Sequence, residues 1–279
     1  MSSFDLMKYQ LAGALILVSA AWPVHAQSDP GTSLWELGVF GVGVSQQAYP
    51  GSADRVDRLL ALPFFVYRGK FLRADRGGAG LRALKTADFE LDIGLASTFG
   101  SKADDIAARR GMPDIGTLLE IGPRLKWNLG AESGDGYWQA EFPLRGVFDF
   151  NDHMAHKGTA FEPTLVFERR SLRGWQYRAN FGSVIGDRRL ADTFYGVAPV
   201  YATPQRPAYA ARSGLIAWRL GTTISHEVTP DLRLFAFARV DSVAGAANTA
   251  SPLVVQRTGA SVGLGLTYTL SRSQRVGLD

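Results

Sequence analysis

The sequence predicts an all-β protein: a transmembrane, antiparallel up-and-down β-barrel of about twelve strands behind a cleaved signal peptide. Three observations lead to this prediction: a repeated alternation of apolar and polar residues, an N-terminal export signal, and no later run of the roughly 20 apolar residues that a membrane helix needs. In residues 117–129, the apolar Leu119, Ile121 and Leu125 alternate with Glu120 and Arg124. Successive strand side chains point to opposite faces, so such segments expose one face to lipid and turn the polar one inward.

The N-terminus has the features of a secretory signal. Lys8 precedes an apolar stretch, residues 11–22, which is too short to cross a bilayer and is followed by Pro23 and the small-residue site Val24-His25-Ala26. We expect residues 1–26 to be cleaved before Gln27, leaving residues 27–279 as one barrel domain. An uncleaved anchor is the alternative.

Composition excludes several classes of function. The chain has 279 residues, 46% of them hydrophobic, and a mean hydropathy of −0.03, which suits a soluble all-β domain as well as an outer-membrane barrel. There is no cysteine, which excludes disulfides, thiolate metal sites and a cysteine nucleophile. The net charge is +4, but acidic and basic residues are interleaved, so we expect no nucleic-acid partner.

Strands are expected wherever the alternation recurs between Gly-, Asp- and Pro-rich turns. The alternation is clearest in residues 89–99, where Phe89, Leu91 and Ile93 oppose Glu90 and Asp92. The expected strands are residues 34–44, 58–67, 71–74, 79–84, 89–99, 115–129, 137–150, 159–169, 175–185, 213–226, 232–240 and 259–270.

Loop lengths favour the count of twelve, with ten as the alternative. Bacterial barrels have an even number of strands, short periplasmic turns and long external loops. If residues 71–74 and 79–84 are two separate strands, the long and short connections fall on opposite sides. The long ones begin at Ser45, Gly100, Gly186 and Asp241, and the tight turns are at Arg68, Lys85, Ser171 and Glu227.

Aromatic residues near the segment ends are typical of the girdles at a lipid interface. They are Trp35, Phe99, Trp127, Tyr137, Trp138, Phe150, Trp175 and Tyr177. Charged residues on the opposite face of the strands are expected to pair across strands and to leave little free path for water. They are Glu90, Asp92, Glu120, Arg124, Lys126, Glu141, Arg145, Glu162, Arg178, Arg219 and Arg233.

Three short motifs occur in order along the chain: Tyr49-Pro50-Gly51-Ser52-Ala53-Asp54, then Leu60-Ala61-Leu62-Pro63-Phe64-Phe65-Val66-Tyr67-Arg68-Gly69, then Ala247-Asn248-Thr249-Ala250-Ser251-Pro252-Leu253-Val254. They resemble the Y-x-G-S-D-like loop, the P-L-P-x-F-x-Y-R strand and the A-x-x-S-P-L-V element of the MipA/OmpV outer-membrane proteins. Ala61 stands where the family's first proline would be. The motifs span most of the mature chain.

The resemblance implies a scaffold that links a murein hydrolase, a lytic transglycosylase, to a bifunctional penicillin-binding protein beneath the outer membrane of a Gram-negative bacterium. One departure is that such barrels commonly end in an aromatic residue, whereas Tyr268-Thr269-Leu270 is followed here by residues 271–279. We expect a monomer in outer-membrane lipid. Its candidate contact surface is the periplasmic turns with residues 27–33 and 271–279.

Catalytic, metal and cofactor sites are not expected, so the protein is predicted not to be an enzyme. His153 and His156 lie beside Asp149 and Asp152, a pattern that is compatible with a surface metal or general-base site of a barrel-embedded lipid hydrolase, but we favour a solvated turn. His226 closes a strand, and the glycines of residues 38–43 suit strand curvature better than a nucleotide loop, because no helix pattern follows them. A small-solute or ion channel is the other alternative function.

Overall fold

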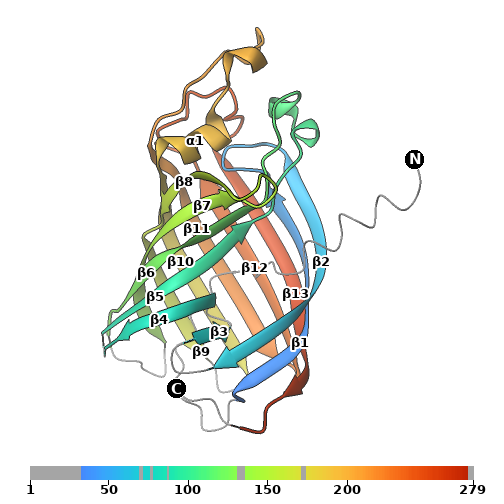
Figure 1. Cartoon of the computed structure of the whole chain (residues 1–279), viewed down its shortest axis with the longest axis vertical. Helices are drawn as coiled ribbons and strands as arrows, with labels where there is room; N and C mark the ends of the chain where they lie inside the picture. The colour runs from blue at the N-terminus through green and yellow to red at the C-terminus, as the bar shows by residue number, and fades with distance from the viewer. Residues whose placement is uncertain are drawn as a thin grey trace, which may run out of the picture.

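The computed structural model describes residues 33–68, 72–75, 78–86, 88–130, 136–170 and 174–275, which form thirteen strands of one antiparallel sheet (Figure 1). The strands are β1 (Trp35–Gln47), β2 (Arg55–Arg68), β3 (Leu72–Asp75), β4 (Gly78–Lys85), β5 (Phe89–Thr98), β6 (Leu118–Asn128), β7 (Tyr137–Asp149), β8 (Ala155–Phe161), β9 (Thr164–Arg170), β10 (Trp175–Gly186), β11 (Gly214–Glu227), β12 (Leu232–Ser242) and β13 (Thr258–Arg272). The helices are the 3-10 turns η1 (Ala103–Asp105), η2 (Ala107–Arg109) and η3 (Pro199–Tyr201), and α1 (Arg188–Tyr195). The predicted all-β antiparallel fold is confirmed, whereas the predicted signal peptide lies outside the described residues.

Neighbouring strands pair in sequence order, and β1 pairs with β13 as well as with β2. The expected strand at residues 159–169 is instead two strands, β8 and β9, which both lie between β7 and β10. Pro163 separates them, because a proline nitrogen has no hydrogen to donate to a sheet. Residues 71–74 and 79–84 were expected as two short strands, and β3 and β4 confirm them.

A helix inside the long irregular stretch at residues 186–212 was missed. The carboxylate of Asp187 caps α1 by accepting a hydrogen bond from the Leu190 N–H at 2.8 Å. The helix buries Leu190, Ala191 and Tyr195 against the sheet end. None of the described helices is long and apolar enough to cross a membrane.

The outer face of the sheet carries an apolar band, as the alternation predicts. Its most exposed members include Leu59 and Leu264, whose side chains are 87% and 71% exposed. Trp127, Trp138, Phe150, Trp175 and Tyr177 are exposed as the girdle prediction requires. The prediction is wrong for Tyr137, which is buried because its position in β7 has the inward parity.

The two ends of the sheet differ. The long connections gather at one end, with α1, η1 and η2 at the top of Figure 1, and we call this the cap end. The ends of β2, β4, β9, β11 and β13 lie at the other, which we call the turn end. This sorting of connections is the one that the loop lengths predict.

Candidate functional site

Charged side chains from β5, β6 and β7 form a ladder on the inner face of the sheet. The strand registers place Asp92 opposite Arg124 and Glu90 opposite Lys126. Arg124 binds Asp92 through two bonds, Nη2 to Oδ2 at 2.7 Å and Nε to Oδ1 at 3.0 Å. The Lys126 ammonium lies 2.9 Å from both Glu90 and Asp92. These side chains are nearly all buried, so removing one partner would leave an uncompensated charge.

The ladder continues across the next strands. Arg178 lies 3.1 Å from Glu141 on β7 and 3.5 Å from Glu168 on β9. Nearer the cap end, the Arg145 guanidinium lies 3.2 Å from Glu120 and 3.1 Å from Glu162.

The ladder ends on β11 and β12. Arg219 lies 2.8 Å from Asp241 and 3.6 Å from Glu162, and Arg239 lies 2.9 Å from Asp241. At the turn end Arg233 pairs with Glu227. All eleven charged residues predicted to pair across strands do so. Glu168, Arg239 and Asp241 were missed, although the alternation of apolar and polar residues in their strands also places them on the inner face.

The inner face of β1, β2 and β13 carries mainly apolar residues and glycines instead, and Phe235 and Phe237 extend this apolar surface onto the middle of β12. The rings of Phe40 and Phe235 stack with centroids 5.5 Å apart. The Phe64 ring covers Gly38, where an added Cβ would lie 2.6 Å from it, and the Phe237 ring covers Gly263 in the same way at 2.3 Å. Glycine therefore makes room for an aromatic ring on the neighbouring strand.

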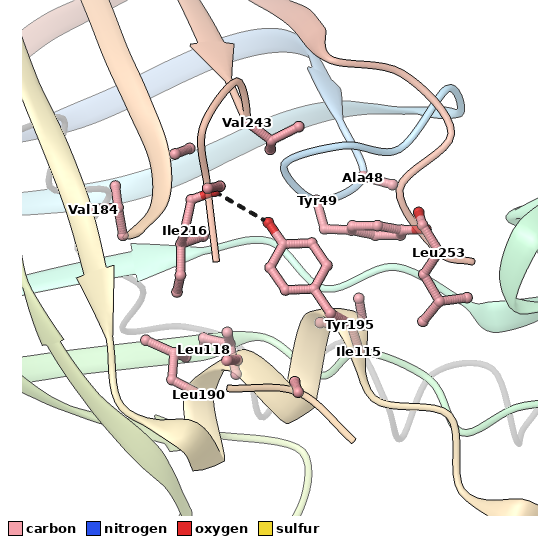
Figure 2. Packing of buried hydrophobic residues seen from close by; sticks show 14 of the residues in the cluster. Ala48, Tyr49, Ile115, Leu118, Val184, Leu190, Tyr195, Ile216, Val243 and Leu253 are labelled. Atoms are coloured by element: carbon pink, nitrogen blue, oxygen red, sulfur yellow. Dashed lines mark hydrogen bonds between the residues drawn. The ribbon is translucent and has the colours of Figure 1, made fainter. Parts of the chain in front are cut away.

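An apolar core closes the cap end, and it is built from residues far apart in the sequence (Figure 2). Tyr49 donates its hydroxyl to the Leu253 carbonyl at 2.8 Å. The Tyr195 hydroxyl lies 3.0 Å from the Pro50 carbonyl and 3.5 Å from that of Ile216. Four connections therefore share one core: those after β1, β5, β10 and β12. We call this assembly the cap.

The first and third sequence motifs meet in the cap. The Gly51 carbonyl accepts a hydrogen bond from the Val255 N–H at 2.8 Å, and Gly51 has a φ of +95°, which favours glycine. The Ser52 carbonyl accepts from the side-chain amides of Gln47 and Gln256 at 2.6 and 2.7 Å. The motifs therefore have a structural role, which is to hold the loop after β1 against the loop after β12.

Arg109 joins the η2 turn to α1. Its guanidinium donates to the carbonyls of Thr193 and Phe194, both at 3.3 Å, and lies 5.8 Å from the centre of the Tyr49 ring. Burial raises the pKa of Tyr49 to about 12, although the positive charge of Arg109 acts in the opposite direction. Burial also raises the pKa of Tyr195. Both phenols therefore stay neutral at physiological pH.

The three histidines among the described residues have different surroundings. His153 is in the exposed turn before β8, with a φ of 47°. The His156 ring packs on Phe148 with a centroid distance of 5.3 Å, and its Nδ1 lies 3.2 Å from Arg189. The His226 ring stacks on Trp175 with a centroid distance of 4.4 Å. Among the described residues, no group of three His, Cys, Asp or Glu side chains is placed to hold a metal ion.

The predicted contact surface is described in part. Residues 27–32 and 276–279 lie outside the described residues, while residues 271–275 lie at the turn end. There Arg272 pairs with Asp231 and donates to the Pro230 carbonyl at 2.9 Å. A hollow of about 330 Å³ is lined by Asp231, Tyr268, Thr269, Leu270, Ser271 and Arg272.

Comparison with known proteins gives one family. The family model described as MltA-interacting protein MipA matches residues 37–270. No curated protein sequence matches the chain. Among solved structures, a NanC porin is similar with a TM-score of 0.39 and 10% identity, covering 84% of this chain and 100% of the porin. A bacterial polysaccharide outer membrane secretin has a TM-score of 0.40 and 10% identity, covering 86% of this chain and 99% of the secretin.

Proposed function

The chain belongs to the MipA family of MltA-interacting proteins, and from this premise we propose that it is an outer-membrane β-barrel scaffold in cell-wall maintenance. It brings a murein hydrolase, a lytic transglycosylase, together with a bifunctional penicillin-binding protein on the periplasmic side. The family match over residues 37–270 is the observation that carries this proposal.

The apolar outer band supports placement in a bilayer, because a soluble sheet would bury such a face against a second layer. Long connections of outer-membrane barrels face the exterior and tight turns face the periplasm. In this orientation the cap faces outward. The turn end, with its hollow between Asp231 and the end of β13, faces the murein enzymes.

The inner face supports a scaffold over a channel. The ladder places paired charges from β5 to β12 across the interior, and the cap packs four connections over the outer end. We expect no discrete conductance steps in a planar bilayer. Regular steps from the wild-type protein would favour the channel instead.

A binding experiment with purified partners tests the scaffold. Immobilised protein in detergent is offered a purified lytic transglycosylase and a purified bifunctional penicillin-binding protein, separately and together. Asp231→Lys at the turn end should weaken binding at least tenfold. Asp104→Lys, an equal charge change on an exposed residue at the cap end, should leave binding unchanged. Failure of the wild-type protein to bind either enzyme, or equal loss in both variants, would contradict the proposal.

The lipid hydrolase alternative depends on the histidines. In the structure, the neighbours of His156 are a guanidinium and an aromatic ring, which neither supply nor accept a catalytic proton in the manner of a serine or a carboxylate. We expect purified protein to release no fatty acid from phospholipid. Activity that His156→Ala abolishes would favour the hydrolase.

A further inference from the structure

One edge of β2 has little pairing. β1 pairs with β2 along its full length, from Trp35 to Gln47. On the other edge, β3 pairs with β2 only at Tyr67 and Arg68, and then turns back into β4 after Asp75. Within the described ranges, residues 55–66 of β2 therefore have a strand on one side alone. Figure 1 shows β3 and β4 as short strands near the turn end. We call the space between β2 and β5 above this hairpin the gap.

The direction of the backbone groups at the gap follows from one hydrogen bond. The Ala48 N–H donates to the Asp54 carbonyl at 3.1 Å, and residues of an antiparallel pair bond to the neighbouring strand at every second position. The backbone N–H and C=O groups of even-numbered residues in β2 therefore bond to β1, and those of odd-numbered residues face the gap. Leu59, Ala61 and Phe65 have this orientation, and so does Pro63. A proline nitrogen cannot donate, so this edge is a poor template for an added strand.

Two contacts bound the gap at the cap end. The Arg58 guanidinium donates to the Asp57 carbonyl at 3.1 Å and reaches the Gly100 carbonyl, just after β5, at 3.4 Å. The Ala107 N–H donates to the Asp54 carboxylate at 2.9 Å. The gap thus lies between the hairpin below and these loop contacts above.

Both faces of β2 at the gap are apolar. Leu59 and Phe65 belong to the outer band, with 87% and 53% exposure. On the inner face, Phe64 covers Gly38 and Val66 is buried, with Leu60 and Leu62 on the same face. The apolar outer surface therefore continues around the open edge to an apolar inner surface, which the charged strands do not offer.

A cation, Arg58, marks the cap end of this edge. Arg58 donates to the carbonyl oxygens of Asp57 and Gly100, whereas the Arg55 guanidinium reaches Ser45 on β1 and the Ala260 carbonyl on β13, away from the gap. Within the described part of the chain, neither guanidinium is paired with a carboxylate, and both are exposed. An anionic group at this position would find one cation, Arg58, that no carboxylate neutralises.

We propose that the gap between β2 and β5 admits a bilayer lipid, with its anionic head group at Arg58 and its acyl chain against Leu60, Leu62 and Phe64. The inference rests on the membrane placement proposed above. Oxygen atoms near the lipid head group would also be hydrogen-bond partners for the backbone groups on this edge, and pure hydrocarbon offers no such partners. With the cap over the barrel end, the route into the interior is sideways from the membrane.

Labelling with single cysteines tests this proposal, because the natural chain has none. Leu62, Phe40 and Thr267 are cross-strand neighbours at one level, all with inward parity. A bimane fluorophore on Leu62→Cys should be quenched by lipids brominated in the acyl chain at least threefold more than one on Thr267→Cys. Folding of each variant is checked by its shift in gel mobility on heating.

A third label separates this inference from the proposed membrane placement. Leu264→Cys on the outer face should be quenched by brominated lipid in any membrane barrel. Without that quenching, membrane placement itself fails. Quenching at Leu264 but not at Leu62 overturns the lateral access alone. Protection of Leu62 from both brominated lipid and aqueous iodide would also overturn it, because protein would then fill the gap.

A comparison of anionic and zwitterionic lipids tests the role of Arg58 in binding the head group. Quenching at Leu62→Cys by brominated phosphatidylglycerol should exceed quenching by brominated phosphatidylcholine at least twofold. Arg58→Glu should remove this preference, whereas Arg188→Glu, on an exposed residue of α1, should keep it. Equal quenching by the two lipids in the parent chain would overturn the role of Arg58.

Discussion

The two halves of the inner face are built from different chemistry although their outer faces are alike. From β5 to β11 the inward positions carry a neutralising ladder of acids and bases, whereas β1, β2 and β13 carry aliphatic side chains, aromatic rings and glycines. The outer face meets one solvent, so it is uniform. The inner-face side chains contact one another between nearby strands, and their composition can differ from strand to strand as long as each polar group finds a partner.

The largest loss of stability is expected when an ion pair in the charged half of the inner face is broken. Arg124→Met removes the guanidinium that binds the buried Asp92 carboxylate at 2.7 Å and leaves this carboxylate with Lys126 alone. The free energy of unfolding should fall by about 3–5 kcal/mol, the usual cost of breaking a buried pair. Urea unfolding in detergent micelles, followed by tryptophan fluorescence, measures it.

The control for this variant is Arg272→Met, which removes a half-exposed ion pair at the turn end. Such a pair contributes about 0–1 kcal/mol. If both variants lost the same free energy, the ladder would not be what stabilises the charged half. The double variant Asp92→Asn with Arg124→Met should recover part of the loss, because it removes the stranded charge.

A smaller effect is expected from the apolar half. Phe235→Leu shortens a buried ring that stacks on Phe40 and covers Gly265. The loss should be about 2 kcal/mol from the buried carbon removed. Unlike the charged variant, it should be the same in low and high salt. Leu234→Ala, on the lipid-facing side of the same strand, is the control; an equal loss there would show that Phe235 has no special packing role.

The smallest effect at neutral pH is expected in the cap. Tyr49→Phe removes one hydrogen bond to the Leu253 carbonyl, worth about 1 kcal/mol. Because burial raises the pKa of Tyr49 to about 12 from 10, its neutral form stabilises the cap fully below pH 10. That contribution is lost as the pH rises from 10 through 12.

Limited proteolysis of the long connections measures this loss as a function of pH. Wild-type loops should become cleavable between pH 10 and 12 while the strands persist. In Tyr49→Phe the increase in cleavage between pH 10 and 12 should be smaller than in the wild type. The increase that remains should come from Tyr195, whose pKa is also raised. An unchanged step in the variant would show that another group controls the cap.

The sequence by itself determined the strands and the facing of their side chains. Side-chain direction in a strand has a period of two, so Glu120, Arg124 and Arg145 could be assigned to the inner face from local pattern alone. The same rule, applied to Tyr137, would have placed it inside, where it lies. Prediction from aromatic type overrode parity there and failed.

The tertiary structure alone decided the cap, the helix α1 and the gap. Tyr49 meets Leu253 across 204 positions of sequence, and α1 is stable where it is because its apolar side packs on that distant core. The free edge of β2 exists because β3 pairs with it only at Tyr67 and Arg68, which depends on how these distant segments meet. Local periodicity reports which way a residue faces, but which segments meet depends on contacts that no short stretch of chain encodes.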